Sequence, residues 1–119
     1  MNLERDTAYW ICKMWGAHPR LRFWRTNRGV GWFANGRPAR KTDPGAYPVE
    51  FGVDGQGDYS GLLDDGRRLE IETKRPKGGR QSDAQKRFQA MIERMGGVYV
   101  LAPTLQEFDA AMAALGITR

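Results

Sequence analysis

The chain has 119 residues, a formal net charge of +5 and one cysteine, Cys12. This length suits a single domain over residues 1–119, and one cysteine excludes an intramolecular disulfide framework or a multi-cysteine zinc site. No apolar run approaches the ~20 residues that cross a bilayer, and no signal-peptide pattern opens the chain. We therefore expect a cytoplasmic protein with no membrane partner.

Positive charge is concentrated in the first third of the chain. Residues 7–42 hold eight Lys and Arg residues and no Asp or Glu. Such a stretch is either a solvated face or a contact surface for a polyanion such as DNA. Within it, Arg25 and Arg28 follow the aromatic pair Phe23 and Trp24, a mixture suited to a nucleic-acid backbone and exposed bases. The tryptophans also fit the alternative of core or dimer contacts.

The first half of the chain predicts one helix, one or two short strands and then an irregular segment. Apolar periodicity predicts a helix over residues 3–15, with strands following over 21–33. Seven glycines and three prolines between residues 29 and 57 predict a long loop or an interrupted hairpin, with a turn at Asn35-Gly36. The expected buried face of the helix carries Leu3, Thr7, Trp10, Ile11 and Met14.

The second half predicts a hairpin followed by a helix, a strand and a helix. Residues 58–63 and 67–74 form the hairpin strands, and the basic, glycine-rich segment 75–80 connects them to a helix over 82–95. Capping boxes are expected at Ser82/Gln85 and Thr104/Glu107. A central strand is expected at 98–101, and a last helix runs from 105 to 115. The second helix should bury Ala84, Phe88, Met91, Ile92 and Met95. The whole is a mixed α/β domain.

The strand at residues 68–74 carries the first sign of chemistry. Its side chains alternate, so Glu70, Glu72 and Lys74 share one face. That pattern alone also fits a half-exposed strand with a ladder of opposite charges. However, Asp58 begins the partner strand, and the hairpin can bring its carboxylate near Glu72. Two such carboxylates are the hard oxygen ligands that Mg²⁺ selects, and Lys74 would lie beside a metal-bound water.

These residues, taken in order with their surroundings, resemble a known family. Asp58, thirteen intervening residues and then Glu72-Thr73-Lys74 resemble the Asp…Glu-x-Lys signature of PD-(D/E)XK nucleases. The flanking motifs resemble the virus-type replication-repair nuclease (VRR-NUC) branch over residues 3–103. These motifs are Arg25-Thr26-Asn27-x-Gly29, Phe51-Gly52-x-x-Gly55-x-x-Asp58-x-x-Gly61, Leu69–Pro76, Gly79-Arg80-x-Ser82-x-x-Gln85 and Gly96-Gly97. The sequence departs from the usual pattern at Tyr59, after the aspartate, and at Thr73, where valine is usual.

The resemblance implies a restriction-endonuclease-like α-β-β-β-α-β core, here with a C-terminal helix, and hydrolysis of DNA phosphodiesters. It implies Mg²⁺ as cofactor, with Mn²⁺ able to substitute. It places metal ligands at Asp58, Glu72 and the main-chain carbonyl of Thr73, and catalytic roles at Lys74, Glu4 and Gln85. Compact stand-alone members look like homodimers that cut branched DNA such as four-way (Holliday) junctions.

Plainer explanations remain open for several of these residues. Asp58 also fits a turn, Glu4 complements the dipole of its helix, and the capping box alone accounts for Gln85. Glu70 lies further from Asp58, which favours a structural role. Phosphate contacts are expected from the connector and the next helix start as well as from the first strands. The candidate DNA-binding residues are Arg25, Arg28, Arg75, Lys77, Arg80 and Lys86.

Two functions of other classes compete with the endonuclease hypothesis. The first is a non-catalytic DNA-binding module that keeps the nuclease fold. It predicts salt-sensitive binding without strand scission. The second is a basic single-strand or RNA-binding protein whose acids are structural, and it predicts no localised metal binding. The combination of Asp58, Glu72 and Lys74 favours the enzyme.

Overall fold

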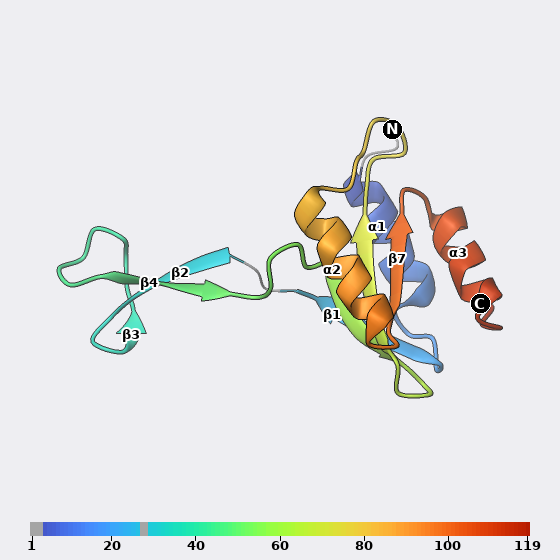
Figure 1. Ribbon diagram of the computed structural model, residues 1–119, viewed down its shortest axis with the longest axis horizontal. Helices are drawn as coiled ribbons and strands as arrows, with labels where there is room; N and C mark the ends of the chain where they lie inside the picture. The colour runs from blue at the N-terminus through green and yellow to red at the C-terminus, as the bar shows by residue number, and fades with distance from the viewer. Residues whose placement is uncertain (1–3, 27–28) are drawn as a thin grey trace.

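The structure is a computed structural model that describes residues 4–26 and 29–119. It is a mixed α/β arrangement of a helix-covered sheet and a projecting arm (Figure 1). The helices are α1 (Glu4–Trp15), α2 (Asp83–Arg94) and α3 (Leu105–Ala114). The strands are β1 (Leu21–Arg25), β2 (Gly29–Ala34), β3 (Arg37–Pro38), β4 (Tyr47–Phe51), β5 (Tyr59–Leu63), β6 (Arg68–Thr73) and β7 (Val98–Ala102). Leu3, Asn27 and Arg28, which carried sequence predictions, lie outside the described residues.

The main sheet has the strand order β1-β5-β6-β7. The first three strands are antiparallel neighbours, and β7 runs parallel to β6 after the crossover through α2. Leu69 and Ile71 of β6 join the core cluster with Ile11 of α1 and Phe108 of α3. Because strand side chains alternate, this core lies on one face of the sheet. On the other face, Phe88 of α2 meets the ring of Tyr99.

The arm is a separate three-stranded antiparallel sheet, in the order β3-β2-β4, inserted between β1 and β5. It projects sideways from the body (Figure 1). The radius of gyration of 16.6 Å therefore exceeds the ~13.5 Å expected for a compact chain of this length. The rings of Phe33, Tyr47 and Phe51 lie together on one face of the arm. A Cβ at Gly31 would approach the Phe51 ring to 2.6 Å, so glycine makes room for this cluster.

The local signals in the sequence are largely confirmed. The helices begin and end within two residues of the expected positions, and the hairpin turns at residues 64–66. The interrupted hairpin is also confirmed, since β2 pairs with β4 and β3 lies between them in the chain. Asn35 and Gly36 both have positive φ, at 54° and 73°, as a tight hairpin turn requires. At the start of α3, Thr104 Oγ1 accepts the Glu107 N–H.

Other expectations were wrong. Trp10 and Met14, expected on the buried face of the first helix, are exposed, with 46% and 38% of their surfaces accessible. Trp24 is 48% exposed, which excludes the core alternative for this residue and leaves the other two untested. Met95, expected in the buried stripe of α2, is 72% exposed because it lies at the helix end. The strand β7 is an edge strand, not a central one. Its apolar character has another cause, since α2 and α3 both pack against it.

In the described part of the chain, no helix combines the length and the apolar character needed to cross a membrane.

Candidate metal centre

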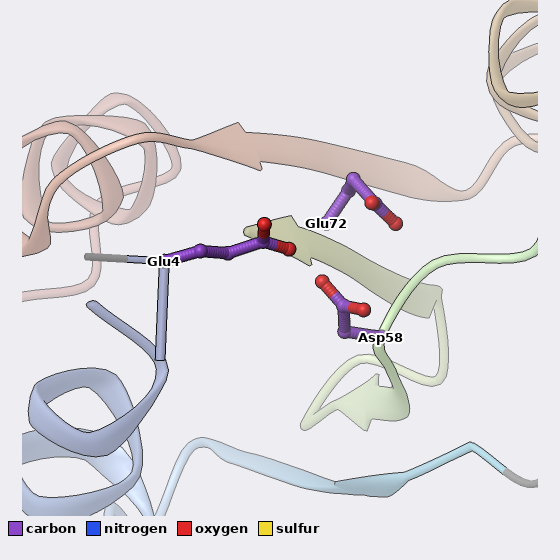
Figure 2. Close-up of side chains that lie close together, drawn as sticks. All are labelled: Glu4, Asp58 and Glu72. Atoms are coloured by element: carbon purple, nitrogen blue, oxygen red, sulfur yellow. The ribbon is translucent and has the colours of Figure 1, made fainter. Parts of the chain in front are cut away.

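Three carboxylates from distant parts of the sequence meet at one end of the body. Glu4 is the first residue of α1, Asp58 immediately precedes β5, and Glu72 is the penultimate residue of β6. Figure 2 shows the three side chains lying close together. One carboxylate oxygen from each lies within 4.8 Å of the others. This spacing is small enough for a single cation to contact all three groups.

Hydrogen bonds fix Asp58 in its place. Its Oδ2 accepts the main-chain N–H and the Oγ1–H of Thr73, each at 2.8 Å. Its main-chain carbonyl accepts the N–H of Thr26 at 3.0 Å. The Thr26 hydroxyl also donates to the carbonyls of Gly57 and Asp58, at 2.7 and 3.1 Å. Thr26 thus anchors the strand start that carries Asp58, a role that was not predicted from the sequence.

Two glycines allow the segment before Asp58 to pass close to its neighbours. Gly55 has φ +79°, and a Cβ there would lie 2.1 Å from the Ala84 carbonyl oxygen in the first turn of α2. A Cβ at Gly57 would lie 2.8 Å from the Ile71 carbonyl oxygen and 3.5 Å from Glu72 Oε2. Neither position accepts a side chain without a backbone shift. These two glycines therefore allow the segment before Asp58 to pack directly against α2 and β6.

Glu72 is the most buried of the three acids, at 3% exposure. Its Oε1 lies 3.3 Å from the Lys74 ammonium and accepts a hydrogen bond from Gln85 Nε2 at 2.7 Å. Its Oε2 has no hydrogen-bond partner among the described residues. Burial, followed by repulsion from the Asp58 carboxylate, raises the pKa of Glu72 to about 7, although Lys74 works in the opposite direction.

Gln85 has two simultaneous contacts, one from each end of its amide. Its Oε1 accepts the Ser82 N–H at 2.8 Å, which completes the capping box of α2. Its Nε2 donates to Glu72. The capping box predicted from the sequence is therefore confirmed, and the same side chain also contacts Glu72. The N-terminus of α2 is tied to the acidic cluster through a single side chain.

The predicted basic residues fall into different places. Arg25 lines a cleft of about 870 Å³ whose walls come from the root of the arm and from the acidic cluster. Arg28 lies outside the described residues. The remaining four are exposed, three in the connector between β6 and α2 and one in α2: Arg75, Lys77, Arg80 and Lys86. The structure gives no contact between these four and the cluster.

Glu70 is separate from the cluster, as its position on the strand suggested. It is fully buried, and its Oε2 accepts from Arg68 Nε at 2.9 Å. This ion pair supports the structural role that the sequence favoured for Glu70. Its other oxygen, Oε1, has no hydrogen-bond partner among the described residues.

The donor set fits a hard divalent cation. Three carboxylates face one ammonium group, so in the absence of a cation they repel one another. The unpartnered Glu72 oxygen is buried at the same place, and such an atom is costly unless a ligand satisfies it. Oxygen-only ligands of this kind are those of Mg²⁺ and Mn²⁺. Glu4, Asp58 and Glu72 are thus the described residues that could hold such an ion.

Comparison with known proteins does not assign a family to the chain. No protein-family model, no curated protein and no solved structure matches it. The resemblance to VRR-NUC nucleases therefore stays a prediction that rests on the sequence motifs.

Proposed function

We propose that this protein is a divalent-metal-dependent endonuclease that hydrolyses phosphodiester bonds in DNA, with branched molecules such as four-way junctions as its preferred substrates. The observation that carries the proposal is the convergence of Glu4, Asp58 and Glu72 beside the Lys74 ammonium. The body also has the element order α1-β1-β5-β6-α2-β7 once the arm is left aside. This order supports the PD-(D/E)XK core that the sequence motifs imply.

In this proposal each residue has a definite task. Glu4, Asp58 and Glu72 hold Mg²⁺ or Mn²⁺, and the Thr73 carbonyl is a further candidate ligand. When bound, such an ion polarises a phosphoryl oxygen and lowers the pKa of water. The Lys74 ammonium, mostly buried next to Glu72, orients the attacking water or offsets phosphate charge. Gln85 holds the Glu72 carboxylate in place through its 2.7 Å hydrogen bond.

The cleft beside the cluster supports a polymeric substrate. Arg25 and Asp58 line the 870 Å³ cleft, and both also line a second hollow of about 490 Å³ bounded by α1. A nucleic-acid strand bound across Asp58 can therefore extend into both hollows. This openness favours cleavage within a strand over removal of terminal nucleotides. Symmetric cutting of a junction requires two active sites, so a homodimer belongs to the proposal.

A cleavage panel at fixed salt tests the proposal. Single-stranded, duplex, flap and four-way-junction DNA are incubated with Mg²⁺ or Mn²⁺ and compared by strand scission. We expect Asp58→Ala to lower cleavage by at least about 100-fold, because it removes several kcal/mol of metal-dependent stabilisation. Asp64→Ala is the matched control, since this acid lies in the hairpin turn and pairs with Arg20.

The panel also separates the competing functions. Unchanged cleavage by the Asp58→Ala variant would refute the assignment of the site. DNA binding that weakens steeply with salt, without scission under either metal, would instead identify a non-catalytic binding module.

A further inference from the structure

The side chain of Thr73 makes a contact outside its own strand. Thr73 is 2% exposed and lies in β6 directly between Glu72 and Lys74. Its hydroxyl donates to Asp58 Oδ2 at 2.8 Å, although the same oxygen already accepts the Thr73 main-chain N–H at 2.8 Å. Two donors from one residue therefore converge on one carboxylate oxygen.

This pair of donors determines which way the Asp58 carboxylate faces. The last torsion of an aspartate is broad, so two hydrogen bonds restrain the orientation of the group more tightly than one. Asp58 also lies beside the carboxylates of Glu4 and Glu72, which repel it when no cation is bound. The second donor helps to hold Oδ2 against β6, which limits the orientations in which the carboxylate can face the shared space.

We propose that the Thr73 hydroxyl is a positioning group for Asp58, which orients this carboxylate for a divalent cation. The inference rests on the proposed metal centre and goes beyond it, because it assigns a task to a side chain that touches neither ion nor substrate. The main-chain carbonyl of residue 73 is a separate group, which a change of side chain leaves in place. Groups that hydrogen-bond to metal-ligating carboxylates commonly change metal affinity by 10–100-fold when removed.

The test is calorimetric titration of the metal-free protein with Mn²⁺ alone. Thr73→Val has nearly the same shape and lacks only the hydroxyl donor, whereas Thr73→Ser keeps that donor and loses the methyl group. We expect the valine variant to bind Mn²⁺ about 10-fold more weakly and the serine variant to stay within about 2-fold of the wild type. Urea unfolding of each variant checks that all of them are folded during the titration.

The outcomes are distinct. Wild-type affinity in Thr73→Val overturns the inference and leaves the metal centre intact. Equal weakening in the valine and serine variants also overturns it, because serine keeps the hydroxyl donor, so the packing of the side chain at residue 73 and not its hydroxyl would then matter. Absence of Mn²⁺ binding by the wild-type protein overturns both this inference and the proposed function.

Discussion

The metal-free acidic cluster should cost the protein stability, and Glu72→Gln should remove that cost. Glu72 has its pKa raised from 4.5 to about 7, first by burial and then by the nearby Asp58 carboxylate. A change of that size corresponds to about 3 kcal/mol of unfavourable free energy when the carboxylate is ionised in the folded state. In the variant, the amide oxygen can still accept from Lys74 and Gln85. Its NH₂ group then takes the place of Oε2, facing the other acids.

The sign of the pH dependence follows from the direction of this pKa. Between pH 4.5 and about 7 the folded protein holds a proton on Glu72 that the unfolded chain has lost. The free energy of unfolding of the wild type should therefore fall as pH rises through this window, and the full cost is present above about pH 8. Glu72→Gln lacks this titration. The two proteins should be similar at about pH 4.5, with the variant more stable by about 3 kcal/mol at about pH 8.5.

Urea unfolding with EDTA, at about pH 4.5 and about pH 8.5, measures this difference. Glu70→Gln is the matched control, since Glu70 is a buried acid on the same face of β6. It should be no more stable than the wild type at the higher pH, because it loses the ion pair with Arg68. The stability advantage of Glu72→Gln over the wild type should grow between the two pH values. If it did not, the conclusion that burial and repulsion destabilise the metal-free cluster would be refuted.

Three further predictions concern the metal and the local structure. Mn²⁺ at about 100 times its dissociation constant should add about 2.7 kcal/mol to the free energy of unfolding of the wild type, and thermal melts should show no such gain for Asp58→Asn. Gly55→Ala should destabilise by more than about 2 kcal/mol because of its positive φ and the Ala84 carbonyl. Gly36→Ala is the control, because its Cβ would meet nothing within 4 Å, and its free energy of unfolding should fall by only about 1 kcal/mol. Similar urea midpoints for the Gly55→Ala and Gly36→Ala variants would contradict this expectation. Ser82→Ala should cost about 1 kcal/mol through the lost cap of α2, measurable in the same titration.

Much of the site was predictable because it is built from local signals. Strand alternation placed Glu72 and Lys74 on one face, and the short hairpin set Asp58 near them. The capping box predicted the start of α2, and with it the location of Gln85. Each of these inferences depends on residues close together in the chain, where turn geometry and hydrogen-bonding rules act directly.

For other parts of the site, the sequence did not reveal which contacts the residues make. Thr26 bonds to the carbonyls of Gly57 and Asp58 across 31 and 32 positions, and nothing about a lone threonine after a strand announces this. Thr73 looked like a neutral replacement for valine in a strand, yet its hydroxyl reaches Asp58. The sequence left two roles open for Glu4, which could complement the dipole of its own helix or also join the cluster. The choice depended on how α1 packs against β6.

By itself, the sequence determined the helices, the hairpin and the pairing of Asp58 with Glu72, because periodicity, caps and turns are properties of neighbouring residues. Only the tertiary structure decided that β7 lies at the edge of the sheet, that Trp10 and Trp24 face outward and that the glycine-rich segment forms a projecting arm. It also decided that Glu4 completes the acidic cluster. The physical reason is that these features depend on how elements far apart in the sequence pack against one another. The hydrophobic effect drives this packing, and because it is non-directional, the order of neighbouring residues does not reveal which surfaces will meet.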